Sequence, residues 1–73
     1  MDNFDHLQFF ENFKLVFRQK LIQNIEIKEA YETTFKELFN EEFSRLGRKL
    51  NKVETELICE LLEDFRRDNS IYE

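Results

Sequence analysis

The side chains of this sequence that are able to do chemistry are few and widely separated. The one histidine, His6, follows Asp2 and Asp5, and the one cysteine, Cys59, lies near the other end of the chain. Zinc sites use three or four ligands, usually several Cys or His, and a reactive thiolate needs a neighbouring base or cation. We therefore interpret the two aspartates as caps of a helix start and Cys59 as a passive, partly covered thiol.

Motifs for phosphate binding or hydrolysis are also missing. The sequence has no Gly-rich phosphate loop, no HExxH and no CxxC, each of which places the required groups at a fixed spacing. No acid, base and nucleophile are paired in a way that predicts catalysis. We expect a protein that is not an enzyme, with no catalytic residues, no metal site and no cofactor.

One charged pair, Glu42 and Arg45, has a spacing that predicts a contact. On a helical wheel Glu42 falls within an apolar stripe, near Phe35 and Leu38. A carboxylate in such a place needs a partner or a raised pKa, and Arg45 is within reach on a helix. We predict a peripheral ion pair. The alternative is a buried polar contact that fixes helix register or subunit pairing.

The composition indicates one small domain made of helices. The chain has 73 residues with no Pro and one Gly, the two residue types that helix interiors avoid. Nine Phe and two Tyr supply large apolar side chains, each able to bury on the order of 150–250 Å². The predicted fold class is all-α, a small antiparallel three-helix bundle, because short connections favour antiparallel neighbours.

Apolar residues three or four positions apart predict where the helices lie. We expect helices over about residues 4–24, 27–46 and 51–68, followed by a frayed tail at 69–73. The stretch 27–50 has the most regular spacing, and we expect its helix to be central, with a shorter helix packed on either side. Its apolar face is formed by Ile27, Ala30, Tyr31, Phe35, Leu38, Phe39, Phe43, Leu46 and Leu50.

The predicted helix ends depend on a few residues. Gly47, the only Gly, suits the left-handed position after a helix, and Asn51 opens a segment with the spacing of a capping box. Asn24 is the weakest boundary, although Asn also adopts the left-handed conformation. The alternative is one unbroken helix over residues 5–46, about 60 Å long, in a long helical hairpin that forms an intermolecular bundle.

Acidic residues outnumber basic ones by 16 to 11, which gives a net charge of −5. Binding to nucleic acid or to an anionic membrane needs basic surface, so we expect neither partner. The first residues lack the pattern of a signal peptide, and no apolar stretch approaches the ~20 residues of a membrane span. One cysteine is too few for a disulfide-stabilised secreted protein. The expected location is the cytoplasm.

A basic cluster at residues 45–52 supports a rival function. Its members are Arg45, Arg48, Lys49 and Lys52. In a helix–turn–helix protein this corner would contact phosphate while the last helix enters a groove of DNA. The exposed side of that helix, however, would present Glu56, Glu60 and Glu63, which phosphates repel. Complementation of a helix dipole explains the cluster more simply. A second rival is an acidic decoy that blocks the cleft of a nucleic-acid-binding protein.

The function that we predict is protein–protein interaction, by a small regulator or adaptor that presents helix faces to a protein partner. The apolar faces are broader than one 73-residue bundle needs, so we expect a homodimer. The candidate interface has two parts. One is the face of the first helix with Leu15 and Ile22, and the other is the outer edge of the last helix with Ile58 and Leu62.

This interface predicts the behaviour of a double variant. Leu15→Glu with Ile22→Glu should weaken self-association by at least about tenfold, because charges are costly in an apolar interface. Helical content should stay intact, since neither change touches the predicted core. Light scattering measures the mass and circular dichroism measures the helix content. Unchanged mass together with unchanged partner binding would exclude this surface.

Overall fold

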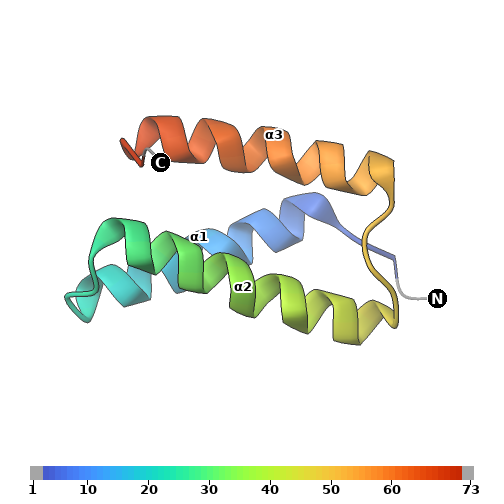
Figure 1. The fold of residues 1–73 in the computed structure, drawn as a ribbon, viewed down its shortest axis with the longest axis horizontal. Coiled ribbons are helices and arrows are strands. Elements are labelled where there is room, and N and C mark those ends of the chain that lie inside the picture. Colours follow the sequence, from blue (N-terminus) through green and yellow to red (C-terminus); the bar gives the residue numbers. More distant parts are fainter. Residues whose placement is uncertain (1–2, 72–73) are drawn as a thin grey trace.

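The computed structural model describes residues 3–71 and contains three helices, α1 (His6–Ile22), α2 (Ile27–Leu46) and α3 (Lys52–Asp68). In Figure 1, α1 and α3 run from right to left and α2 runs from left to right, so that α2 is antiparallel to both other helices. Each helix lies inside its predicted range. The all-α three-helix bundle is confirmed, and the unbroken helix considered as an alternative is wrong. Within residues 3–71, no helix combines the length and apolar character that crossing a membrane requires.

The first helix ends because Asn24 takes the left-handed conformation, with a φ of 67°. The N–H of Ile25 donates to the carbonyl of Lys20 at 3.1 Å, and the N–H of Asn24 donates to that of Leu21 at 3.0 Å. This pair of bonds is a Schellman motif, with Asn at the position that Gly usually occupies. Asn tolerates the conformation better than other residues with a side chain, so α1 stops without Gly or Pro.

A second Schellman motif ends α3, with Ser70 in the left-handed conformation at a φ of 56°. The N–H of Ile71 donates to the carbonyl of Arg66 at 2.8 Å, and the Ile71 side chain is 7% exposed in the core. The expectation of a frayed tail from residue 69 is therefore not met at residues 69–71. The remaining residues of that tail, Tyr72 and Glu73, lie outside the described residues.

The corner between α2 and α3 follows the predicted signals. Gly47 has a φ of 70° and its N–H donates to the carbonyl of Phe43 at 2.9 Å. Asn51 caps α3, since its side-chain oxygen accepts the N–H of Glu54 at 2.8 Å while its own N–H donates to the Glu54 carboxylate at 2.9 Å. These reciprocal bonds form a capping box, which fixes where α3 begins.

The helix that holds the other two together is α1, and not α2 as expected from the sequence. α1 packs against both neighbours, whereas no Cα atom of α2 lies within 8 Å of a Cα atom of α3. The reason is the broad apolar half of α1, on which Phe9, Phe13 and Phe17 are 5%, 0% and 3% exposed. A face that wide accommodates two neighbours, whereas α2 packs closely along α1 and meets α3 through side-chain contacts such as that of Tyr31 with Phe65.

An aromatic cluster centred on Phe65 of α3 fills the interior. Its ring meets Phe10, Phe13 and Phe17 of α1 edge-on, with centroids 6.0, 5.6 and 5.0 Å away. Such ring pairs contribute about 0.5–1.5 kcal/mol beyond the area that they bury, so Phe65 attaches α3 firmly to α1. The buried apolar side chains are Phe9, Phe13, Phe17, Ala30, Tyr31, Ile58, Leu62 and Ile71.

A buried hydroxyl in α2 leads to a stability prediction. Thr34 is 0% exposed, and its Oγ1 has no hydrogen-bond partner among residues 3–71. A buried hydroxyl without a partner costs about 1–3 kcal/mol. Thr34→Val keeps the branched shape and removes the hydroxyl, so we expect it to raise the free energy of unfolding by about 1 kcal/mol. Urea denaturation followed by circular dichroism measures this.

The neighbouring Thr33 provides a matched control. Its hydroxyl donates to the carbonyl of Glu29 at 2.8 Å, so Thr33→Val loses a bond and should leave the free energy of unfolding unchanged or lower. Equal gains in the two variants would show that the missing partner of Thr34 is not the cause.

Candidate functional site

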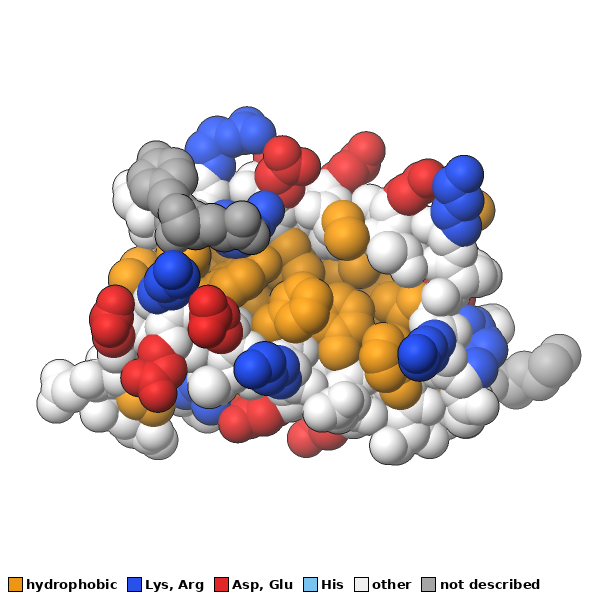
Figure 2. Space-filling view, in the orientation of Figure 1, with side chains coloured by type: hydrophobic (Ala, Val, Ile, Leu, Met, Phe, Trp, Pro, Cys, Tyr) orange, Lys and Arg blue, Asp and Glu red, His pale blue; other side chains and the backbone are white. Residues whose placement is uncertain are grey.

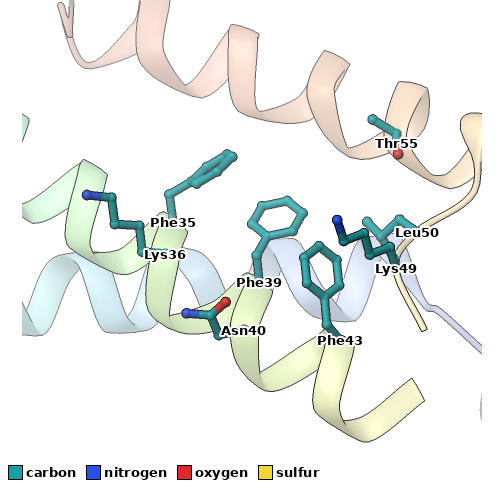
Figure 3. Close-up of a pocket in the computed structure, with 8 residues that line it drawn as sticks. All are labelled: Phe35, Lys36, Phe39, Asn40, Phe43, Lys49, Leu50 and Thr55. Atoms are coloured by element: carbon teal, nitrogen blue, oxygen red, sulfur yellow. The ribbon is translucent and has the colours of Figure 1, made fainter. Parts of the chain in front are cut away.

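Between α2 and α3 the surface is hollowed into an apolar groove, called here the α2–α3 groove. Its volume is about 470 Å³. Figure 2 shows a band of apolar side chains in this region, and Figure 3 shows the side chains that line the groove. The lining residues are Phe35, Lys36, Phe39, Asn40 and Phe43 of α2, Lys49 and Leu50 of the connection, and Thr55 of α3.

Three phenylalanines of α2 form the apolar wall of this groove. Phe35, Phe39 and Phe43 recur every four residues, so their rings project from one side of the helix toward α3 (Figure 3). The ring centroids are 4.4 Å apart for the first pair and 5.9 Å apart for the second. Phe39 also packs on Phe9 of α1, with centroids 4.8 Å apart, whereas Phe35 is 39% exposed. The wall is therefore anchored on α1 and open to water.

Near the start of α2, one helical turn before Phe35, side chains of α2 and α3 contact each other. The rings of Tyr31 and Phe65 stack with centroids 6.3 Å apart, and the Arg66 guanidinium lies 6.0 Å from the centre of the Tyr31 ring. Burial raises the pKa of the Tyr31 hydroxyl above its usual value, although the charge of Arg66 opposes this shift. Tyr31 thus stays neutral beside a cation, and the contact bridges α2 and α3 at this end.

At the other end of the groove, an ion pair holds the α2–α3 connection. Two nitrogens of Arg48 contact the two carboxylate oxygens of Glu54 at 2.8 and 3.0 Å. The hydrogen bond from Arg48, followed by that from the Asn51 backbone, lowers the pKa of Glu54 from 4.5 to about 2. Bidentate pairs of this kind are geometrically specific, so the pair positions the segment that brings Lys49 and Leu50 into the groove wall.

The charged side chains at the rim of the groove are both lysines. Lys36 comes from α2 and Lys49 from the connection, and no Asp or Glu of the described chain lines the groove. Neither ammonium group has an ion-pair partner among residues 3–71. The charged groups that line the groove are thus both cationic, although the whole chain has a net charge of −5.

Only half of the predicted interface is on the surface. Leu15 and Ile22 are 57% and 75% exposed on α1, and neither lines the α2–α3 groove. Ile58 and Leu62 are 0% and 3% exposed, so the placement of these two residues on an outer edge of α3 is wrong. Their side of α3 packs into the core because Phe65, on the same face, is attached to α1. The outward apolar residues of α3 include Val53, which is 65% exposed.

The predicted pair of Glu42 and Arg45 is present in the structure. Two guanidinium nitrogens of Arg45 contact the Glu42 carboxylate, and one of them also donates to the backbone carbonyl of Asn3 at 3.0 Å. The Glu42 side chain is 16% exposed and that of Arg45 is 44% exposed, which fits a peripheral ion pair. The contact ties the N-terminal segment to the end of α2.

The wall of the groove is the feature that sequence reasoning missed. Phe35, Phe39 and Phe43 were expected in the core because their spacing follows the apolar face of α2. The sequence signal that could have distinguished these three residues from the core residues of α2 was a second row of small side chains on the same helix. Ala30 and Thr34 form that row and are both fully buried, and only one row is needed to pack on a single neighbour.

Within residues 3–71 no three His, Cys, Asp or Glu side chains are grouped so that they could hold a metal ion. Comparisons with models of protein families, with curated proteins and with solved structures found no match. The function is therefore inferred from the geometry of the α2–α3 groove and from the charges around it.

The Arg48–Glu54 pair predicts a dependence of stability on pH. The pKa of Glu54 is about 2 in the folded chain and 4.5 as a reference, so the unfolded chain takes up this proton first as the pH falls. The stabilisation is therefore complete above about pH 4.5 and is lost toward pH 2. We expect Glu54→Gln to be less stable than the natural chain at pH 6, with the two denaturation midpoints converging near pH 2.

Urea denaturation at pH 6, 4, 3 and 2 tests this prediction. Glu63→Gln is a suitable control, because its carboxylate is 64% exposed and lies outside the cap. The denaturation midpoints of this control should vary with pH as those of the natural chain do. If the denaturation midpoints of Glu54→Gln and of the natural chain differ by the same amount from pH 6 to pH 2, the lowered pKa of Glu54 is not the source of the stabilisation.

Proposed function

We propose that this protein is a protein–protein interaction module, a regulator or adaptor, whose α2–α3 groove receives a helical segment of a partner protein. One observation carries the proposal. Phe35, Phe39 and Phe43 form a continuous apolar row in a groove that no other element of the described chain covers. An apolar row at helical spacing is the usual receptor for the apolar face of a helix.

The arrangement of the three helices supports the same proposal. α2 and α3 both pack on α1, and their backbones stay more than 8 Å apart between Cα atoms, so a fourth helix laid over the gap would contact both. Burying one exposed Phe side chain contributes about 1.5–3 kcal/mol. Phe35 is exposed, and Phe39 and Phe43 are partly buried, so the row supplies part of the apolar contact of a complex, in which a few large side chains commonly dominate the binding energy.

The basic cluster gives less support to a nucleic-acid-binding function. Arg45 is paired with Glu42, and Arg48 is paired with Glu54, so two of its four cations already have carboxylate partners. The acidic-decoy function has no structural feature of its own in its favour. We therefore favour the proposal of a protein-binding regulator, and we propose a cytoplasmic location on the basis of the composition.

Self-association through α1 is a separate part of the proposal. Leu15 and Ile22 are exposed and lie two helical turns apart, so they present an apolar strip on the side of α1 that α2 and α3 leave uncovered. We propose that this strip pairs two copies of the chain. The double glutamate variant described above tests it independently of the groove.

A pair of matched variants tests the groove. Phe35 and Leu57 are each 39% exposed, but only Phe35 lines the groove. In affinity capture from the native lysate, Phe35→Gln should lower the recovery of specific partners at least about tenfold, because the lost burial is worth ~1.5 kcal/mol or more. Leu57→Gln should retain them.

Quantitative mass spectrometry of the captured proteins, beside circular dichroism of each variant, gives the readout. Equal recovery with Phe35→Gln and with the natural chain would exclude the groove as the binding site. Loss of the same proteins with Leu57→Gln would assign binding to another surface.

A further inference from the structure

We propose that the occupant of the α2–α3 groove is an amphipathic helix of another protein that carries acidic residues beside its apolar face. This inference rests on the proposed function and adds the chemistry of the ligand. It combines two features of the groove: the length of its aromatic row and the two lysines at its rim.

The aromatic row sets the size of the matching segment. Phe35 and Phe43 are eight residues apart on α2, which corresponds to about 12 Å along the helix axis. A ligand helix lying alongside covers that length with about two turns. It therefore needs apolar side chains at positions i, i+4 and i+7 or i+8 to meet the three rings.

The lysines determine which charges flank those apolar positions. Lys36 lies beside Phe35 and Lys49 lies near Phe43, at opposite ends of the row of rings (Figure 3), and neither has an ion-pair partner among residues 3–71. Carboxylates near either end of the apolar row of the ligand helix would meet an ammonium group, whereas lysines there would be repelled. Glu32 lies four residues before Lys36 on α2, but no Asp or Glu of the described chain lines the groove itself.

A second copy of this chain fits the groove less well. The outer side of α3 has exposed Val53 and Leu57 next to Glu56 and Glu60, so its negative charge would complement the two lysines of the groove. Its two apolar side chains span only one turn, however, and do not match three rings. Such a contact would also join two different surfaces head to tail. Contacts of that kind produce open-ended filaments unless the rotation between neighbouring copies closes them into a ring.

A small amphiphile such as a fatty acid is also a poorer match. Ligand pockets typically bury about 70–90% of a small molecule, but this groove is open along the face seen in Figure 2. A helix can leave its polar side in water while its apolar side fills such a groove. We therefore assign the groove to a helix.

The test uses three 18-residue helical peptides with Leu at the same i, i+4, i+7 and i+11 positions. Their flanking positions carry only Glu, only Gln or only Lys. Fluorescence anisotropy measures each dissociation constant at low and at high salt, and amide chemical shifts map where each peptide binds. We expect the Glu peptide to bind roughly 3- to 30-fold more tightly than the Gln peptide, as two exposed ion pairs would give.

Two variants of equal net charge localise the effect. Lys36→Gln with Lys49→Gln should bring the Glu and Gln peptides to within about twofold of each other. Arg18→Gln with Lys28→Gln removes the same charge outside the groove and should leave the preference for Glu unchanged. High salt should reduce that preference in the natural chain.

The outcomes separate this inference from the proposed function. Equal affinity for the Glu and Gln peptides, or tighter binding of the Lys peptide, with shifts confined to the groove, would overturn the acidic ligand and leave the function standing. No groove shift with any peptide would overturn both. Groove shifts with dodecanoate alone, or a dimer that Phe35→Gln converts to a monomer, would assign the groove to an amphiphile or to a second copy.

Discussion

The structure depends on the aromatic contact surface that α1 provides for two helices at once. Phe13 and Phe17 meet Phe65 of α3, and Phe13 also meets Tyr31 of α2 with centroids 5.5 Å apart. Large rings fill the space between the helices near this point, so α2 and α3 are linked through side chains and not through close backbone packing. The separation of α2 and α3 is therefore a direct consequence of how the core is built.

That separation explains why a small acidic protein has an apolar groove whose charged lining residues are both lysines. α2 satisfies its packing against α1 with one stripe, and the second stripe remains as the row of Phe35, Phe39 and Phe43. A chain of this size gains stability by burying every ring that it can, so rings left in contact with water indicate a different role. This exposed row is the basis of the proposal that the groove binds a partner.

Much of the fold was predictable because its signals are local. The cap at Asn51 with Glu54, the left-handed turn at Asn24 and the ion pair of Glu42 with Arg45 each depend on residues close together in sequence, and the first two involve backbone preferences that act before any tertiary contact forms. The sequence pattern therefore identified the helices and where they end.

The choice of buried faces was less predictable. Ile58 and Leu62 were expected on the surface and are buried, while Phe35 was expected in the core and is 39% exposed. A helical wheel shows that a face is apolar but not which neighbour covers it, and two broad stripes on one helix give two solutions of similar burial. Which face is buried is determined by packing between rings that are far apart in the sequence, chiefly those around Phe65, and a local sequence pattern does not contain this information.

The two contacts near the ends of the groove have a consequence for selectivity. Tyr31 contacts Phe65 and Arg66 beyond the Phe35 end of the groove, and the connection held by Arg48 and Glu54 joins the helices at the other end. For the proposed helical ligand, the distance between these two contacts would limit how many anchoring side chains fit side by side. The proposal therefore implies selection among ligands by the length of their apolar row as well as by the identity of its side chains.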